Sequence, residues 1–337
     1  MKKLISLMLA LMLVFSLATV AMADDVLPTD PYEGKLDKAT SFTKEYVVTN
    51  GTAPKETFDF NVSYKSFKNN EGETATAATQ PTVTLGDAVF NSALSSTGTA
   101  NVSVEISNYE TVALGAYTYE ITEVVPTTKT AGTTYNNKPV YLVVTILRNE
   151  DSSKHYVAAI HYEDASGKKT GKITNSYNAG QLSVTKQIEG NMADMNKKFE
   201  FTVVFTPATG TEFDTSVQIA NDAATTNRTY TATPNANGTY TIKFSLGDNE
   251  TATFTNIPVG TAYTITENAE SYTSAHTTAA DGTIAGGDRD EDVWTNTLNK
   301  DVDTGITLDS LPFVLILAVC AGAVVLFVIK RRNSVEF

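Results

Sequence analysis

The sequence predicts an all-β protein whose central part folds as two tandem β-sandwich domains. Thr, Val, Tyr and Phe fill short runs in which apolar and polar residues alternate, and Asn-Gly and similar turns separate these runs. Such alternation is typical of strands that bury one face. No long helical period is visible between the two ends of the chain. An internal repeat is the second observation, and it indicates two copies of one sandwich.

Three short strings of residues recur in the same order in the two halves of the chain. Each places one polar residue on a strand face that is otherwise apolar, because side chains two residues apart share a face. The pairs of strings are Phe42-Thr-Lys44 and Leu182-Ser-Val184-Thr-Lys186, Tyr119-Glu-Ile121-Thr-Glu123 and Tyr263-Thr-Ile265-Thr-Glu267, and Ile173-Thr-Asn175-Ser-Tyr177 and Trp294-Thr-Asn296-Thr-Leu298. The repeat therefore predicts a buried lysine, glutamate and asparagine in each domain.

The spacing of these strings is similar in the two halves over most of their length. Lysine and glutamate are 79 residues apart in the first half and 81 in the second, whereas glutamate and asparagine are 52 and 29 residues apart. Alternating runs at 58–64 and 199–205 begin 14 and 13 residues after the lysines and predict further strands. The longer last interval predicts an insertion in the first domain, with an extra strand at 141–145. The joint between the domains is expected near Asn178-Ala-Gly180.

The buried triplets suggest a reaction, because burying a lone charge is costly unless the charge is neutralised or consumed. Burial lowers the pKa of a lysine and raises that of a carboxyl group, which gives an unprotonated amine beside a proton donor. The glutamic acid can then hydrogen-bond the asparagine carbonyl and pass a proton to the departing ammonia. Folding supplies the proximity, worth roughly 7–11 kcal/mol of barrier in oriented intramolecular reactions. We therefore predict an amide bond between lysine and asparagine that forms without an external enzyme or cofactor.

Two structural alternatives compete with this reaction. Each triplet can be a hydrogen-bonded buried cluster, or the lysine can extend along the sheet edge and reach solvent. The occurrence of the ordered triplet twice in one chain favours the reaction over both alternatives.

The two ends of the chain indicate export and anchoring. Residues 1–23 begin with Lys2-Lys3, continue through a short apolar stretch and end at Ala21-Met-Ala23, which predicts a secretory signal cut before Asp24. A retained membrane helix is the alternative for this segment. Residues 311–329 are an unbroken apolar run, followed by Lys330-Arg331-Arg332, and predict a membrane span with a cytoplasmic basic tail.

The pentad Asp301-Val-Asp-Thr304-Gly305 lies directly before this span. A Thr-Gly pentad, an apolar span and a short basic tail in this order resemble the sorting signal of Gram-positive sortase substrates. The common form of that signal carries Leu-Pro at its first two positions, and this pentad departs from it. The resemblance implies cleavage between Thr304 and Gly305, while the departure leaves the cognate sortase undefined.

Charge and cysteine content exclude several function classes. The formal charge of the chain is −13, and without the five basic and two acidic residues of the terminal segments, 20 basic and 36 acidic residues remain, a charge of −16. Such a surface repels nucleic acid phosphates. The only cysteine, Cys320, lies in the apolar tail, which excludes a cysteine nucleophile, a thioester or a thiolate metal site from the exported part.

Histidines and acidic residues do not form a recognisable metal or catalytic pattern. His155, His161 and His276 are few and scattered. The acidic run 288–292 could hold calcium, but it lacks the spacing of an EF-hand loop, and a solvated loop is the favoured interpretation. No cofactor is expected.

The ordered lysine, glutamate and asparagine resemble the isopeptide-linked, immunoglobulin-like domains (CnaB-type) of Gram-positive pilins, and in particular the two-domain streptococcal major pilin of the FctA type. The resemblance covers nearly the whole exported chain. It implies that Lys44 bonds to Asn175 with Glu123 assisting, that Lys186 bonds to Asn296 with Glu267 assisting, and that the domains form a rod. The expected division is a signal peptide at 1–23, sandwich domains at 24–178 and 179–300, a sortase motif at 301–305, and the span and tail at 306–337.

A shaft subunit also needs a lysine that accepts the sortase-activated threonine of the next subunit. In the resembled pilin this lysine lies seven residues before the bond-forming asparagine of the first domain, and counting back from Asn175 gives Lys168. The surrounding run, Ser166-Gly-Lys-Lys-Thr-Gly-Lys172, is polar and should be exposed. Lys169 is the second candidate, and an ordinary solvated basic loop is the alternative.

Two classes of function remain for this sequence. The first is the structural backbone subunit of a covalently polymerised, wall-anchored pilus, with a pilus-class sortase, further copies of itself, minor pilins and peptidoglycan as partners. The second is a binding protein, either a wall-anchored adhesin or a basal or tip pilin that contacts a host ligand. An enzyme is not expected.

Overall fold

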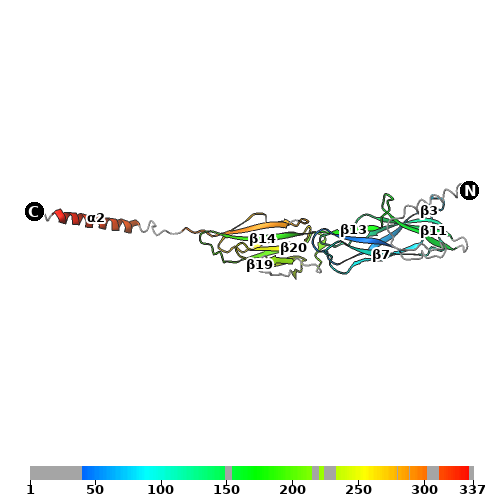
Figure 1. The fold of residues 1–337 in the computed structure, drawn as a ribbon, viewed down its shortest axis with the longest axis horizontal. Coiled ribbons are helices and arrows are strands. Elements are labelled where there is room, and N and C mark those ends of the chain that lie inside the picture. The colour runs from blue at the N-terminus through cyan, green and yellow to red at the C-terminus, as the bar shows by residue number, and fades with distance from the viewer. Residues whose placement is uncertain are drawn as a thin grey trace. The chain divides into compact units, whose positions relative to one another are not determined.

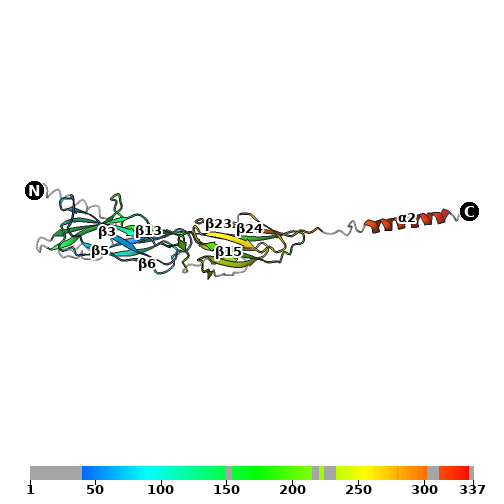
Figure 2. The same ribbon diagram turned by 180° about the vertical axis from the view of Figure 1, so that it is seen from behind.

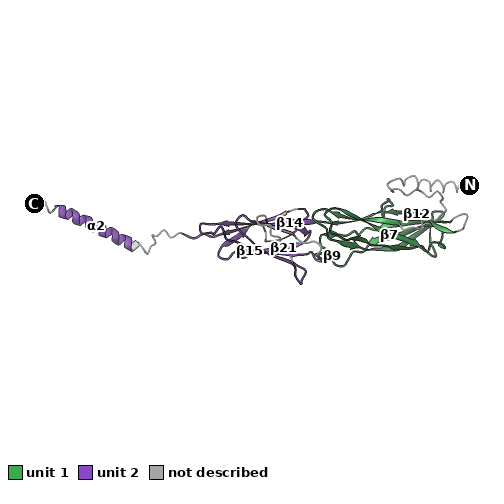
Figure 3. Ribbon diagram, turned by 60° about the horizontal axis from the view of Figure 1, so that its bottom comes forward, with its two compact units in different colours: residues 1–178, 210–217 green, residues 179–209, 218–337 purple. Residues whose placement is uncertain are grey.

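The computed structural model describes residues 40–148, 154–214, 220–223, 233–278, 280–287, 289–301 and 311–333. The chain divides into two compact units, one of residues 1–178 and 210–217 and the other of residues 179–209 and 218–337 (Figure 3). Both units are built of strands, so the prediction of an all-β fold is confirmed. The predicted signal segment 1–23 and the predicted cleavage site, Thr304 and Gly305, lie outside the described residues.

The first unit contains two five-stranded sheets, with strand orders β10-β13-β1-β7-β5 and β12-β11-β8-β3-β4 (Figures 1 and 2). Two shorter ladders join β2 to β6 and β9 to β16. The strands are β1 (Thr40–Val48), β2 (Glu56–Phe58), β3 (Phe60–Asn69), β4 (Thr74–Ala75), β5 (Thr82–Leu85), β6 (Ala88–Phe90), β7 (Gly98–Ser107), β8 (Gly115–Glu123), β9 (Lys129–Thr130), β10 (Thr133–Thr134), β11 (Val140–Arg148), β12 (His155–Glu163), β13 (Lys172–Tyr177) and β16 (Thr211–Glu212).

The second unit also contains two five-stranded sheets, with strand orders β17-β20-β14-β24-β22 and β18-β19-β15-β21-β23. Its strands are β14 (Ala179–Glu189), β15 (Phe199–Thr206), β17 (Ala220–Ala223), β18 (Thr233–Pro234), β19 (Tyr240–Leu246), β20 (Thr251–Pro258), β21 (Ala262–Glu267), β22 (Thr273–His276), β23 (Asp281–Thr283) and β24 (Arg289–Thr297).

The repeat seen in the sequence corresponds to a repeat of strand pairing. In each unit the strand that carries the lysine lies between an antiparallel neighbour and a parallel one, and the parallel neighbour carries the asparagine. The register is the same in both units, because Asn175 lies opposite Tyr46 and Asn296 lies opposite Ile188, each two residues beyond the lysine. The strands that open and close each unit are therefore side by side.

The two sheets of each unit pack face to face through aromatic side chains. In the first unit Phe42 on β1 meets Phe60 on β3 with ring centroids 5.1 Å apart. In the second unit Phe205 on β15 meets Phe254 on β20 at 5.6 Å. These rings are mostly buried, and the hydrophobic effect of burying such large side chains supplies the main stabilisation of each sandwich.

Two details of the strand pattern differ from the sequence prediction. The run 58–64 is not one strand, since β2 ends at Phe58 and pairs with β6, whereas β3 begins at Phe60 and pairs with β8. Similarly, the part of the acidic run from Arg289 onward is the start of β24 and not a solvated loop, and Asp292 is 1% exposed. Both differences arise because the neighbouring strand, which the local sequence does not reveal, decides where pairing begins.

The predicted strand at 141–145 and the predicted apolar span are both present. The run 141–145 lies within β11, which pairs with β8 on one side and with β12 on the other. The apolar span is the helix α2 (Leu311–Asn333), which is long and apolar enough to cross a membrane and has Lys330, Arg331 and Arg332 in its last turn.

The packing of Phe201 generates a prediction for the second unit. Phe201 is fully buried, stacks on Phe244 at 5.5 Å and meets the edge of Trp294 at 5.8 Å. Phe201→Ala should lower the free energy of unfolding of this unit by about 3–5 kcal/mol, because it removes a buried ring and leaves a cavity. Trp294 is the only tryptophan of the chain, so its fluorescence during guanidinium unfolding reports on this unit alone.

Thr202→Ala is the matched control for this experiment, since Thr202 is the next residue on β15 and points to the opposite, partly exposed face. It should change the same free energy by no more than about 0.5 kcal/mol. Equal stabilities of the two variants would contradict the assigned core.

Candidate functional site

Lys44, Glu123 and Asn175 come together in the interior of the first unit. Lys44 and Asn175 lie on the adjacent strands β1 and β13 of one sheet, and Glu123 is the last residue of β8 in the other sheet. Lys44 Nζ forms an ion pair with Glu123 Oε2, and Asn175 Nδ2 donates a hydrogen bond of 2.5 Å to Glu123 Oε1. One carboxyl group therefore bridges the two nitrogen atoms.

Lys186, Glu267 and Asn296 form the corresponding cluster of the second unit. Lys186 Nζ and Asn296 Nδ2 both lie 2.9 Å from Glu267 Oε1. The lysine also donates a hydrogen bond of 3.2 Å to the carbonyl oxygen of Trp294, and Ser274 Oγ donates one of 2.7 Å to Glu267 Oε2. The carboxyl group again contacts both nitrogen atoms, here through a single oxygen.

Both clusters are shielded from solvent. The side chains of both lysines and of Glu123 are 0% exposed, and that of Glu267 is 1% exposed. This burial is inconsistent with a lysine that extends along the sheet edge to reach water. Each lysine is instead confined beside its glutamate and asparagine.

Aromatic rings surround the two amines. Lys44 Nζ lies 4.5 Å from the centroid of the Phe58 ring and 6.0 Å from that of Phe60, and Lys186 Nζ lies 4.8 Å from that of Phe199. Phe58 and Phe199 were not among the predicted site residues, although their similar spacing from the two lysines was a usable signal. These rings contribute to the apolar environment of the amines.

The environment changes the protonation of both lysines in the same direction. Burial lowers the pKa of Lys44 below the usual value of 10.5, and the hydrogen bond and charge of Glu123 oppose this effect only in part. Burial likewise lowers the pKa of Lys186, opposed by Glu267. A lowered pKa increases the fraction of the amine that is unprotonated and therefore nucleophilic at a given pH.

The amide groups of the two asparagines are held differently. Asn175 Oδ1 accepts a hydrogen bond of 2.8 Å from the main-chain N–H of Asn136. Asn296 Oδ1 is buried and meets no hydrogen-bond donor among the described residues. In both sites the glutamate contacts the amide nitrogen and not the carbonyl oxygen, which differs from the arrangement expected from the sequence. Asn136 was not among the predicted site residues, because no local sequence pattern marks a main-chain donor.

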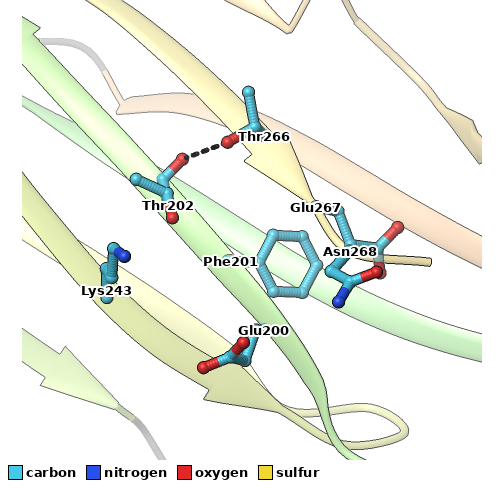
Figure 4. Close-up of a pocket in the computed structure, with 7 residues that line it drawn as sticks. All are labelled: Glu200, Phe201, Thr202, Lys243, Thr266, Glu267 and Asn268. Atoms are coloured by element: carbon cyan, nitrogen blue, oxygen red, sulfur yellow. Dashed lines mark hydrogen bonds between the residues drawn. The ribbon is translucent and has the colours of Figure 1, made fainter. Parts of the chain in front are cut away.

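A small surface pocket of about 210 Å³ lies beside the second cluster (Figure 4). Glu267 and its neighbour Asn268 line it on one side, and Thr266 Oγ1 donates a hydrogen bond of 3.4 Å to the carbonyl oxygen of Thr202 across it. The remaining lining residues are Glu200, Phe201 and Lys243. The second cluster thus lies close to the margin of its sandwich.

The candidate acceptor lysines lie in a turn between β12 and β13. Asp164 Oδ1 accepts hydrogen bonds from the main-chain N–H groups of Ser166 and Lys168, at 2.8 and 3.1 Å, and so orders this turn. Lys168 and Lys169 are both exposed. An intermolecular nucleophile requires this accessibility.

The histidines remain apart from the two clusters. His161 Nε2 lies 3.6 Å from Glu163 Oε2, and His276 stacks on Trp294 with ring centroids 4.6 Å apart. In the described part of the chain, no group of three or more His, Cys, Asp or Glu side chains is placed to hold a metal ion.

Comparison with known proteins identifies the class of fold. Residues 180–298 match a family described as a domain of unknown function (DUF7601). A protein named pilin from Streptococcus pyogenes serotype M1 is 24% identical over 306 residues, which cover 86% of this chain and 89% of the relative.

Solved structures give the same result. The crystal structure of the major pilin from Streptococcus pyogenes is 20% identical, covers 78% of this chain and 99% of its own, and superposes with a TM-score of 0.54. A glutamate-to-alanine mutant of that pilin gives 21% identity, the same coverage and a TM-score of 0.52. The chain therefore has the all-β fold of this streptococcal major pilin, as the resemblance in the sequence implied.

The lowered pKa of Lys44 generates a prediction about stability. In an Asn175→Ala chain the lysine cannot be consumed, and the folded state holds fewer protons on it than the unfolded state below pH 10.5. The free energy of unfolding of the first unit should therefore rise as the pH increases from neutrality toward 10.5. Denaturant unfolding followed by tyrosine fluorescence at a series of pH values measures this rise.

A Lys44→Met, Asn175→Ala chain is the matched control, because it retains the other titrating groups of the unit. The pH dependence attributed to Lys44 is the difference between the two chains. A difference that does not change with pH would contradict the lowered pKa.

Proposed function

We propose that this protein is a structural backbone subunit of a covalently polymerised cell-surface pilus, and not an enzyme. The observation that carries this proposal is the pair of buried Lys–Glu–Asn clusters, one in each sandwich, on a fold similar to that of a streptococcal major pilin. Each cluster joins the strand that opens its unit to the strand that closes it.

The clusters are suited to autocatalytic isopeptide bonds, Lys44 to Asn175 and Lys186 to Asn296. Proton transfer from lysine to glutamate within the ion pair yields an amine and a carboxylic acid. The amine attacks the asparagine Cγ, the glutamic acid protonates the departing nitrogen, which leaves as ammonia, and the resulting carboxylate takes up the proton that Nζ loses. Contact of the same carboxyl group with both nitrogens supports this role for Glu123 and Glu267.

Such bonds suit a protein under tension. In the second unit, load applied between the start of β14 and the end of β24 would otherwise shear these parallel strands apart, and a bond between Lys186 and Asn296 carries the load past their hydrogen-bond ladder. In the first unit, load that enters at Lys168 passes along β13 into β14, and a bond between Asn175 and Lys44 ties β1 to this loaded strand. By the chain-entropy model each bond also stabilises its unit by about 5 kcal/mol, since it closes a loop of more than 100 residues.

The remaining features fit assembly by a pilus-class sortase. Cleavage between Thr304 and Gly305 would release the chain from α2 and its basic tail, and the exposed turn would supply Lys168, or Lys169, as the acceptor on the next subunit. Further copies of the chain, minor pilins and peptidoglycan are the partners that this assembly requires. A cleaved signal segment at 1–23 would direct the chain to the cell surface.

A wall-anchored adhesin, or a basal or tip pilin, is the alternative built from the same domains. The exposed acceptor turn favours the shaft subunit over a tip pilin or an adhesin that does not polymerise, because neither of these has to accept the threonine of another subunit.

The proposed cross-links predict a loss of mass. Purified residues 24–304 should be lighter than the sequence mass by two ammonia molecules in intact-mass spectrometry. Glu123→Ala and Glu267→Ala should each raise the mass by that of one ammonia molecule relative to the cross-linked chain, apart from the change of side chain, because each removes the carboxyl group that transfers protons at one site. Glu120→Ala is a matched control, since Glu120 lies three residues earlier on β8 and pairs with the exposed Lys65. If the mass of the parent chain equals the sequence mass, neither bond forms, and both clusters are only buried hydrogen-bonded groups.

The proposed assembly predicts a second phenotype, in cells that carry the cognate sortase. Lys168→Arg should abolish the ladder of covalent oligomers on denaturing gels, because guanidinium is not an amine nucleophile, while the positive charge of the turn is kept. Lys169→Arg is the matched control and should leave the ladder intact. A ladder that persists in the double variant would exclude this turn as the acceptor.

A further inference from the structure

We propose that the main-chain N–H of Asn136 is the oxyanion donor for the cross-link between Lys44 and Asn175. This inference rests on the proposed function, because it assigns a further catalytic group to one of the two reactions. It also implies that the two sites form their bonds with different assistance from the protein.

The hydrogen bond to Asn175 fixes the orientation of its side-chain amide. The N–H of Asn136 can donate only to the oxygen, Oδ1, at 2.8 Å, so the nitrogen, Nδ2, must face Glu123. The amide is therefore held at both ends, with a donor on the oxygen that gains negative charge and a carboxyl group on the nitrogen that leaves. A donor aimed at the developing oxyanion is among the most effective means of lowering the barrier to acyl transfer.

The segment that carries this N–H is anchored before the reaction begins. Asn136 lies between β10, which pairs with β13, and β11. The preceding residue, Tyr135, donates a hydrogen bond of 2.5 Å from its hydroxyl group to Glu56 Oε1, and its ring lies against Phe58 with centroids 6.0 Å apart. The Asn136 side chain closes the following turn, since its Nδ2 donates a bond of 2.7 Å to the carbonyl oxygen of Lys138.

This anchoring makes Tyr135 a positioning residue. Its hydroxyl group touches no reacting atom, but it holds the main chain immediately before the donor. A preorganised donor requires no rearrangement when charge develops, which is why such donors are effective.

The reaction balances without a further reactant. Nζ of the neutral Lys44 attacks Cγ of Asn175, and the electron pair of the carbonyl bond moves to Oδ1, where the N–H of Asn136 stabilises it. Glu123 gives its proton to Nδ2 and takes one from Nζ. The carbonyl bond then re-forms, the bond from Cγ to Nδ2 breaks and one ammonia leaves, so Glu123 ends in the state in which it began.

The second site provides the contrast. Asn296 Oδ1 is buried in the same manner, yet among the described residues it has no donor, and Glu267 instead receives an additional bond from Ser274. A change at Asn136 should therefore affect the first bond and leave the second unaffected.

The test compares Asn136→Pro, which lacks the N–H, with Asn136→Ala, which keeps it and loses only the side chain. Both are made in residues 24–304 carrying Asn296→Ala, so that the loss of one ammonia reports the first bond alone. The chains are collected in urea as they are synthesised, so that they stay unfolded and no bond forms. Dilution of the urea then starts folding, the reaction is quenched at intervals, and the mass of each sample is measured by intact-mass spectrometry. Asn136→Pro should form the bond about 10²–10³ times more slowly than Asn136→Ala.

Two controls separate chemistry from folding. The same substitutions with Asn175→Ala in place of Asn296→Ala report the second bond, whose rate should be identical in both chains. The same substitutions with Lys44→Met, followed by tyrosine fluorescence, give the folding rate without the reaction. Tyr135→Phe should slow the first bond on the order of tenfold through a less well placed donor, and this slowing should exceed its effect on the folding rate.

The outcomes are distinct. Equal first-bond rates of Asn136→Pro and Asn136→Ala would overturn the inference and leave the proposed function standing. Where the proline chain fails to fold, an unchanged first-bond rate of Tyr135→Phe would overturn it instead. Absence of ammonia loss from the parent chain at both sites would overturn the proposed function and this inference together.

Discussion

The structure depends on one electrostatic constraint, a lysine amine enclosed in an apolar interior beside a single carboxyl group. An amine in this position is costly to keep charged, because both lysine side chains are fully buried and each amine lies beside an aromatic ring. In the described structure Lys44 bonds to the carboxyl group of Glu123, which also accepts the hydrogen bond of Asn175. Glu267 contacts Lys186 and Asn296 in the same way, and the main-chain carbonyl of Trp294 accepts a further bond from Lys186. Burying such a cluster costs free energy of folding, and a reaction that consumes the charged groups removes this cost.

The β-sandwich topology supplies the geometry that such chemistry requires. Parallel pairing of the opening and closing strands, with the same register in both units, brings lysine and asparagine to adjacent positions of one sheet. The facing sheet contributes the glutamate from β8 or β21. The lysine and the asparagine of each unit are more than a hundred positions apart in the chain, and the main-chain ladders hold them on neighbouring strands. Reacting groups that are held in this way do not have to meet by diffusion, as two separate molecules would.

The two units use this shared frame with different local support. In the first, the main-chain N–H of Asn136, in the segment between β10 and β11, reaches the asparagine carbonyl. In the second, where the interval from glutamate to asparagine is 23 residues shorter, Ser274 contacts the carboxyl group and the carbonyl oxygen stays without a donor in the described part of the chain. The two units thus differ both in the length of the interval between glutamate and asparagine and in the hydrogen bonds that hold the asparagine side chain.

Alternation and spacing along the chain are sufficient to predict the all-β class, the internal repeat, and the lysine, glutamate and asparagine of each unit, because these patterns can be read from neighbouring residues. The separation of β2 from β3, the burial of Asp292 in β24 and the contact of the glutamates with the amide nitrogens become visible only in the folded chain. The folded chain also reveals the N–H of Asn136, since a main-chain donor has no residue type to mark it. Pairing partners and hydrogen-bond directions are set by segments distant in the chain, and no pattern within a single strand encodes them.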